Sequence, residues 1–201
     1  MKRYVILTAL LGILIGLGCT SSSTDLTSGK IVDLTHSYDE NAVFWPTAKE
    51  FHLEPVSAGM TEKGYYYTAN NFSAAEHGGT HIDAPIHFNK NGKTLEALPL
   101  EQVIGKGVVI DVTEKCTADR DYQVQVEDFT AWEQKHGTQL NDVIVLLRTG
   151  FEKYWPDRIK YMGTDERGAE AVPKLHFPGL HPDAAKWLVE NRTIKAIGLD
   201  T

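Results

Sequence analysis

Cysteine is scarce in this sequence, since only Cys19 and Cys116 occur among its 201 residues. The fold must rest on its apolar core, because at most one intrachain disulfide is possible, and none if Cys19 is acylated. Basic residues form no cluster and the formal net charge is −7, so a nucleic-acid partner is not expected. No Gly-x-Ser-x-Gly segment occurs, which weighs against a serine hydrolase with a nucleophile elbow.

Long uncharged apolar runs are also absent, except over residues 4–18 near the N-terminus. Lys2 and Arg3 precede this run, which is the order of an export signal, and the run is too short for a membrane span. Removal of residues 1–18 would take the formal net charge from −7 to −9, because Lys2 and Arg3 are lost. We therefore expect an exported protein of the cell envelope.

Cys19 follows the apolar run and begins a polar tether, residues 19–29. This order resembles a bacterial lipoprotein signal, in which Cys19 would be lipidated and would attach the protein to the membrane. Such signals usually have Leu three residues before the cysteine, where this chain has Gly16. Ordinary signal-peptide cleavage, with release into the periplasm, therefore stays an alternative.

Residues 30–201 have the length of one ordinary globular domain. Short apolar or β-branched runs predict strands at residues 30–35, 65–71, 107–112, 143–147 and 194–199. Apolar stripes predict a helix that contains Trp132 and ends at Gly137, and another at residues 182–191. The alternation of strands and helices predicts an α/β domain.

Three of the eight histidines lie between residues 77 and 87. Three imidazoles and a carboxylate share one parity in this run: His77, His81, Asp83 and His87. The apolar side chains have the other parity: Ile82, Ala84, Ile86 and Phe88. In an extended chain, residues two apart share a face, so the polar groups would project together while the apolar groups pack into the core. Gly78, Gly79 and Pro85 disfavour a helix.

Two imidazoles and a carboxylate suit Zn²⁺, Mn²⁺ or Fe²⁺, and three protein ligands leave coordination positions for water and substrate. The last histidine of the run, His87, could be a fourth ligand or a proton shuttle. A strand whose histidines only form hydrogen bonds is the alternative. We prefer the metal site because four such residues share one face beside two glycines.

The run His77 to His87 resembles the signature of the cyclase family, His-x-Gly-Thr-His-x-Asp-x-Pro-x-His, and matches it at every fixed position. That family includes bacterial kynurenine formamidases (arylformamidases) and isatin hydrolases. The resemblance implies that His77, His81 and Asp83 bind one or two divalent ions, zinc or manganese, with Asp83 able to bridge a second ion. It also implies that His87 is the catalytic proton donor and acceptor.

Weaker similarities extend over residues 30–201. The segment Phe44-Trp45-Pro46, which we expect at the surface, resembles a family segment in which Trp45 would contact the substrate ring. Leu147 to Gly150 is similar to the family's Arg-Thr-Gly strand end, and Phe177 to Ala185 to its Pro-Gly-Leu helix entry, with His181 where serine is usual. We expect His181 to be an ordinary helix-entry residue.

The resemblance implies a single domain with a mixed central sheet and flanking helices, the swivelling β/β/α fold, and a homo-oligomer.

The family continues past the strand that ends at Thr201 and supplies a further histidine and glutamate to the second metal. We therefore expect this sequence to lack the C-terminal part, as a fragment, with natural truncation as the alternative. His176 cannot be assumed to replace the missing ligand.

The resemblance thus implies a hydrolase of a small formamide, lactam, lactone or other amide, and the histidine run suits the metal-activated water and histidine proton shuttle that such a hydrolase would use. The alternative is an envelope lipoprotein that binds metal without turnover, or a truncated inactive homologue. A serine or cysteine hydrolase is the third candidate. Cys116 lies beside Lys115 but has no histidine close in sequence, so we expect a plain thiol.

Overall fold

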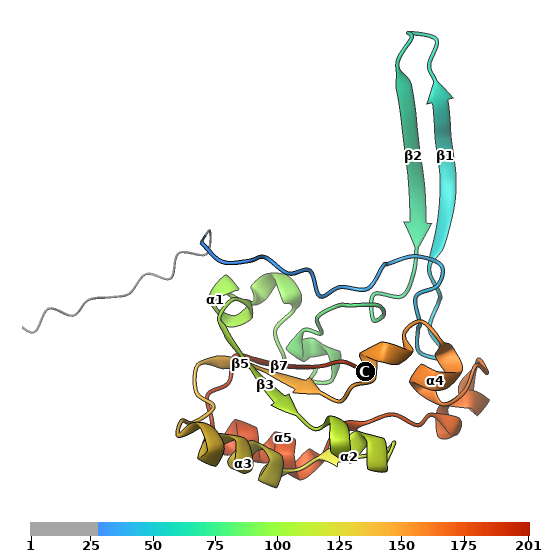
Figure 1. Ribbon diagram of the computed structural model, residues 1–201. Helices are drawn as coiled ribbons and strands as arrows, with labels where there is room; N and C mark the ends of the chain where they lie inside the picture. The colour runs from blue at the N-terminus through green and yellow to red at the C-terminus, as the bar shows by residue number, and fades with distance from the viewer. Residues whose placement is uncertain (1–27) are drawn as a thin grey trace, which may run out of the picture. The chain divides into compact units, whose positions relative to one another are not determined.

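The computed structural model describes residues 28–201 (Figure 1). The chain divides into a first unit, Met1–Leu34, and a compact unit, Thr35–Thr201. The expected signal segment, the lipidation site Cys19 and nearly all of the tether lie outside the described residues. Among the residues that are described, no helix combines the length and the apolar character that crossing a membrane requires.

The centre of the compact unit is a parallel sheet of three strands in the order β3-β5-β7. The strands are β3 (Lys106–Asp111), β5 (Val143–Arg148) and β7 (Ala196–Leu199). In β5, Val143, Val145 and Leu147 are buried. β-branched and apolar residues of this kind pack well between neighbouring strands and a covering layer.

Two helices cover one face of this sheet, α3 (Val126–His136) and α5 (Pro182–Asn191), and they lie side by side in Figure 1. Phe129 of α3 is fully buried, and its ring stacks on Trp187 of α5 at 6.2 Å between centroids. Helix α3 ends at Gly137, whose φ of 64° is the left-handed conformation that glycine adopts readily. Pro182 begins α5, where its fixed φ suits a helix start.

Smaller elements connect these layers. The helices are α1 (Leu100–Val103), α2 (Thr113–Ala118) and α4 (Arg158–Met162). A second, two-stranded parallel sheet consists of β4 (Gln123–Val124) and β6 (Gly179–Leu180). Short 3₁₀ helices occupy Pro85–His87, Leu95–Ala97, Glu152–Tyr154 and Ala169–Lys174.

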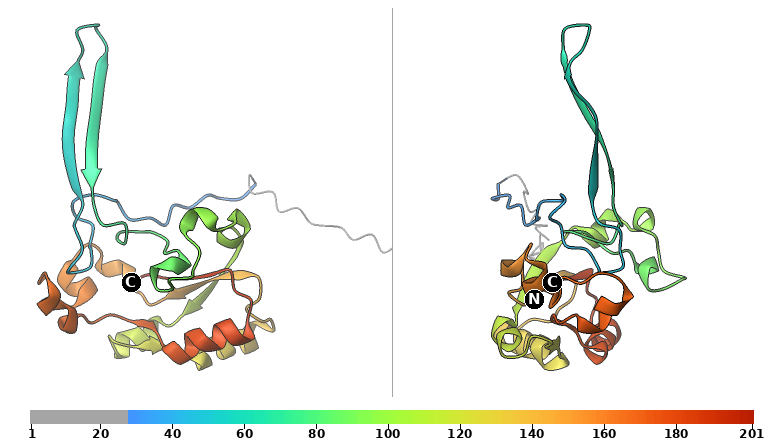
Figure 2. Two further views of the ribbon diagram at one scale, coloured as in Figure 1. Left: turned by 180° about the vertical axis from the view of Figure 1, so that it is seen from behind. Right: turned by 90° about the vertical axis from the view of Figure 1, so that its right-hand side faces the viewer.

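An antiparallel hairpin of β1 (His52–Met60) and β2 (Tyr66–Ser73) extends from the rest of the compact unit (Figure 2). A β-bulge between Pro55 and Ser57 shifts the register along β1. In the described part of the chain, these strands pair only with each other. Their side chains are mostly exposed.

The predicted α/β class is confirmed, as a mixed structure with parallel and antiparallel sheets. The predicted strand at residues 30–35 is wrong: this segment has no strand, and Ile31 and Leu34 are exposed. A strand needs a neighbour to satisfy its backbone groups, and local β propensity does not supply one.

Candidate metal centre

The histidine run forms a loop that is held near its beginning. Gly78 makes an isolated antiparallel bridge with Phe44, and the Phe44 ring occupies the space that a Cβ at Gly78 would need. Gly79 has a φ of 66°, and a Cβ there would lie 2.7 Å from the Tyr38 ring. Both glycines are therefore required locally, one for close packing and the other also for its conformation.

The expectation of an extended strand over residues 77–87 is wrong. The run contains only the bridge at Gly78 and the 3₁₀ turn Pro85–His87. The apolar residues of the run do not enter the core, because Ile82 and Ile86 are exposed and Phe88 is 92 % exposed. The left-handed φ of Gly79 breaks the strict alternation of side chains on which the strand interpretation depended.

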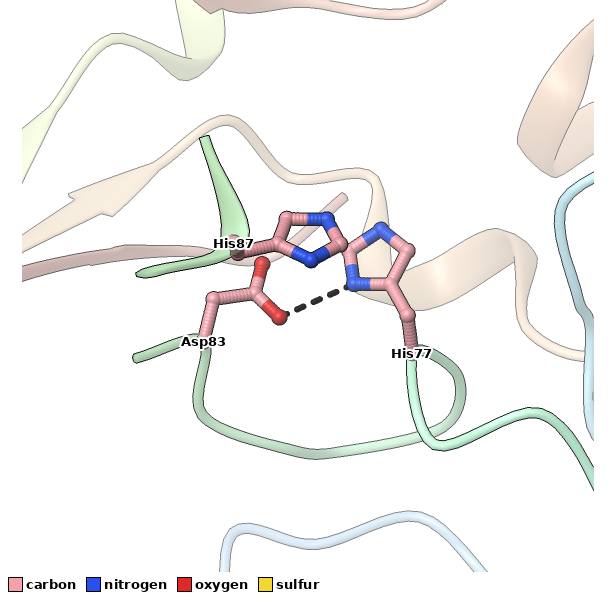
Figure 3. Close-up of side chains that lie close together, drawn as sticks. All are labelled: His77, Asp83 and His87. Carbon is pink, nitrogen blue, oxygen red and sulfur yellow. Dashed lines mark hydrogen bonds and ion pairs between the residues drawn. The ribbon is translucent and has the colours of Figure 1, made fainter. Parts of the chain in front are cut away.

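The polar residues of the run nevertheless lie close together, and Figure 3 shows three of them, His77, Asp83 and His87. His77 Nδ1 lies 2.9 Å from Asp83 Oδ1. His81 Nε2 lies 2.8 Å from His77 Nδ1 and 3.2 Å from Asp83 Oδ1. These three atoms form a triangle with edges of 2.8–3.2 Å. The loop therefore gathers the three predicted ligands around one point.

The three atoms of this triangle can all accept hydrogen bonds, but the two imidazole rings supply too few N–H protons to link them. The second ring nitrogen of His81, Nδ1, lies 2.8 Å from the carbonyl oxygen of Gly79, which can only accept. A neutral His81 therefore carries its proton on Nδ1 and presents a lone pair at Nε2. A neutral His77 has one proton to place at Nδ1, toward Asp83 and His81. With both rings neutral, the three atoms thus share at most one proton.

A divalent cation fits this donor set. Ligands about 2.0–2.1 Å from a zinc ion in tetrahedral geometry lie about 3.3 Å from one another. The observed edges of 2.8–3.2 Å are close to that value. A cation would replace the shared proton and would neutralise the carboxylate of Asp83, which is a chemical reason for the residues to converge.

His87 lies close to the same group. The 3₁₀ turn Pro85–His87 carries its ring to 4.6 Å from the His77 ring, measured between centroids. Single ligand atoms of His77, Asp83 and His87 lie within 4.8 Å of one another, and these residues could hold a metal ion. Two sets of ligands are therefore possible. His77 and Asp83 belong to both, and the third ligand is His81 in one set and His87 in the other.

Trp45 follows Phe44, whose bridge to Gly78 brings this backbone alongside the start of the loop. The expectation that the whole segment lies at the surface is wrong, because Phe44 and Pro46 are buried. Trp45 is partly exposed, and its ring packs edge-on against Phe177, 6.4 Å away. The structure thus places Trp45 beside the loop, while the contacts among the predicted site residues join His77 to His81, Asp83 and His87.

Two arginines that sequence reasoning missed hold this segment. Arg158 donates to the carbonyl oxygen of Phe44 at 3.2 Å. Arg167 donates to the carbonyl oxygens of Phe44 and Trp45, at 3.2 and 3.1 Å. Nothing in the local sequence marks them, since both lie more than 110 positions from the residues that they hold.

A small hollow of about 240 Å³ lies next to the loop. Its walls include the rings of His36 and Trp155, which stack at 4.8 Å between centroids. The backbone N–H of His36 donates to the Thr80 hydroxyl at 3.0 Å, which ties this hollow to the histidine run. His36 and Trp155 are therefore further residues beside the site that sequence reasoning did not single out.

His181 and His176 lie outside the group. The His181 side chain accepts a hydrogen bond from the N–H of Asp183 at 3.1 Å and caps α5, in agreement with a helix-entry role. His176 Nδ1 lies 2.8 Å from Asp121 Oδ2. Neither contact involves the histidine run.

Known proteins similar to this chain were found by sequence and by structure. Isatin hydrolase of Roseibium aggregatum is 28% identical over 206 residues, covering 92% of this chain and 72% of that protein. A kynurenine formamidase of Bacillus thuringiensis is 28% identical over 158 residues, covering 75% of each. The solved structure of isatin hydrolase A from Labrenzia aggregata, bound to benzyl benzoate, has a TM-score of 0.73 and 32% identity, covering 88% of this chain and 70% of that one.

The chain spans three quarters or less of the length of each of these relatives. The family model of the cyclases matches residues 32–201, which include the histidine run and the central sheet. Because this match covers most of the sequence, the chain belongs to the cyclase family.

Proposed function

We propose that this protein is a metal-dependent hydrolase that cleaves a carbon–nitrogen bond of a small formamide, lactam or other amide, or the ester bond of a lactone. The observation that carries the proposal is the triangle of His77 Nδ1, His81 Nε2 and Asp83 Oδ1, with edges of 2.8–3.2 Å. The relatives support the substrate class, since isatin contains a cyclic amide and a formamidase acts on a formyl amide.

His77, His81 and Asp83 would hold zinc or manganese, as one ion or two. The bound ion supplies Lewis acidity, which polarises a carbonyl and lowers the pKa of water toward neutrality. The side chains of His77 and Asp83 are 41% and 40% exposed. The site is therefore open to water and to a small substrate.

His87 would carry the proton. Its ring lies 4.6 Å from the His77 ring but outside the triangle, so it can face a bound substrate while His77 faces the metal. An imidazole ring can accept a proton from the attacking water and donate it to the leaving nitrogen. Trp45, beside the start of the loop, would contact an aromatic substrate and orient it.

A hydrolysis assay of the purified protein with zinc or manganese tests the proposal. The panel contains N-formylkynurenine, isatin, simple amides and lactones. We expect turnover of at least one compound, abolished by chelation and restored by the metal. His136→Ala is the matched control, because His136 lies at the end of α3 and stacks on Trp132. No hydrolysis of any compound by protein that retains its metal would favour a binding protein without turnover.

Export and lipidation of the chain are proposed together with this activity, from the order of Lys2, Arg3, the apolar run and Cys19. Labelling of cells with a palmitate analogue tests this point. We expect incorporation that Cys19→Ser abolishes, with the protein in the membrane fraction. Release of unlabelled protein into the periplasm would instead support ordinary signal-peptide cleavage.

A further inference from the structure

The chain folds back on the 3₁₀ turn Pro85–His87 through residues 89–93, which we name the return segment. The N–H of Asn89 donates to the carbonyl oxygen of Pro85 at 3.2 Å. The N–H of Ile86 donates to the last carbonyl oxygen of the return segment at 3.1 Å. Both ends of the return segment are thus hydrogen-bonded to the backbone that carries the last histidine of the run.

Gly92 lies where the return segment meets this turn. A Cβ at Gly92 would lie 2.5 Å from the carbonyl carbon of Pro85, 2.6 Å from its oxygen and 2.7 Å from the nitrogen of Ile86. These are backbone atoms, so no rotation of a side chain could make room for it. Gly92 is not among the glycines with a positive φ, and the close approach alone requires glycine here. A larger residue would therefore separate the return segment from the turn.

The His87 ring depends on the backbone of this turn for its direction. His87 is exposed, and among the described residues no hydrogen bond or ion pair holds its ring. Its ring contacts are with His77, 4.6 Å away between centroids, and with Phe88, 4.4 Å away. Figure 3 shows the His87 ring beside that of His77. A side chain with so few contacts points where its backbone and its rotamer direct it.

We propose that Gly92 is a positioning residue for His87. The close approach of the return segment fixes the 3₁₀ turn, and the turn aims the His87 ring at the site beside His77. The inference rests on the proposed function in one respect, that His87 carries the proton of the hydrolysis. A proton donor must lie within hydrogen-bond reach of the leaving nitrogen, and a misplacement of about 1 Å can lower the rate about 100-fold.

The return segment is remote from the hydrophobic core. Four of its five residues are exposed: Asn89, Lys90, Asn91 and Lys93. None of the described core residues lies between positions 82 and 104. Separation of the return segment from the turn should therefore move the His87 ring and leave the central layers folded.

Nuclear magnetic resonance of labelled histidine rings tests the geometry, with Asn91→Ala as the matched control. The rings of His77 and His87 lie close enough for a nuclear Overhauser effect between their protons. We expect this effect in the wild type and in Asn91→Ala, because Asn91 bonds to the Asn89 side chain through its backbone N–H. Gly92→Ala should lose the effect and keep a native circular dichroism spectrum. An unchanged effect in folded Gly92→Ala would overturn the proposal.

A second variant, Asn89→Ala, serves if Gly92→Ala does not fold. The Asn89 Oδ1 atom accepts the N–H of Asn91 at 3.1 Å, and the Asn89 carbonyl oxygen accepts the N–H of Gly92 at 2.6 Å. Removal of the side-chain acceptor loosens the return segment without adding atoms, so we expect a weaker Overhauser effect between the two histidine rings. In that case, an effect of wild-type strength would overturn the proposal.

A double-mutant cycle, on a compound that the protein hydrolyses, tests the link to catalysis. We expect Gly92→Ala to lower kcat about 10- to 100-fold, with KM and bound metal unchanged. In the His87→Ala background the same substitution should change kcat less than about twofold, because no ring remains to be positioned. An equal loss in both backgrounds would mean a merely structural role and would overturn the proposal. If the wild type hydrolyses no compound, the proposed function fails, while the Overhauser effect still decides whether Gly92 positions His87.

Discussion

The ring of Phe44 fills the space that a side chain at Gly78 would occupy, and a β-bridge joins the two residues. Gly78 directly follows His77, one of the three residues whose donor atoms converge. The position of His77 therefore depends on Phe44, 33 positions earlier in the chain, through a contact at Gly78 that only glycine permits. Loss of this contact should disturb the group of His77, His81 and Asp83 before it disturbs the central sheet.

Gly78→Ala tests this dependence. The added methyl group overlaps the buried Phe44 ring, so we expect a loss of about 1–3 kcal/mol in the free energy of unfolding and a weaker affinity for zinc. Gly107→Ala is the control, because a Cβ there meets nothing within 4 Å. Urea denaturation and zinc titration measure both quantities. An alanine at position 78 that leaves both unchanged would show that the ring contact does not position the loop.

His87→Ala separates the two possible roles of that residue. If His87 carries the proton, the variant should retain its metal and lose about 10²–10⁴-fold in kcat. Metal analysis and steady-state kinetics of the same preparation provide the two values. Loss of metal from His87→Ala, to the extent seen in a ligand variant, would instead make His87 a fourth ligand.

The ion pair of Glu133 and Arg192 joins α3 to the end of α5, with side chains only 11–12% exposed. Hydrogen bonds from Arg192 lower the pKa of Glu133 below its usual 4.5, and the N–H of Leu140 adds a further bond. A lowered folded-state pKa stabilises the fold above pH 4.5, and this stabilisation is lost as pH falls through the folded value.

Glu133→Gln should therefore reduce the free energy of unfolding by about 1.5–3 kcal/mol at pH 7. The difference from the wild type should shrink as the pH is lowered below 4.5, because the wild-type carboxylate is then protonated as well. Urea denaturation at a series of pH values follows this convergence. A difference that stays constant down to pH 3 would contradict the pKa assignment.

Cys116 should be inert in the folded protein. Burial, and then the negative charge of Asp200 and other carboxylates, raises the pKa of its thiol to about 11. At pH 8 roughly one thiol in a thousand is ionised. In a Cys19→Ser variant, a thiol reagent should label Cys116 slowly until urea unfolds the chain. Rapid labelling of the folded variant would mean that the thiol is accessible and activated.

The elements of the central layers were predictable because their signals are local. Pro182 and the apolar stripe behind it predict α5 over the residues where it is found, and Gly137 correctly marks the end of α3. The strands β3, β5 and β7 follow from short apolar runs between turn residues. In each case, the buried side chains lie within one element, and the residues that begin or end that element lie directly beside them in the sequence.

The histidine run shows what the sequence could not provide. Its residue types and spacing identify a donor set, and the side chains do converge. The prediction of an extended strand was wrong because Gly79 has a left-handed φ and because the Phe44 ring packs on Gly78. Both features involve residues outside the run, Tyr38 and Phe44. For the same reason, sequence periodicity could not show that Ile82, Ile86 and Phe88 remain exposed.

Metal analysis of the purified protein, by mass spectrometry of the bound ions, tests the central claim most directly. The wild type and the His136→Ala control should each contain at least one zinc or manganese ion per chain. His81→Ala should bind at least about 100-fold more weakly, since even loss of an outer-shell partner costs 10- to 100-fold. A wild-type protein that takes up no divalent metal, or a His81→Ala variant that binds as tightly, would contradict the account.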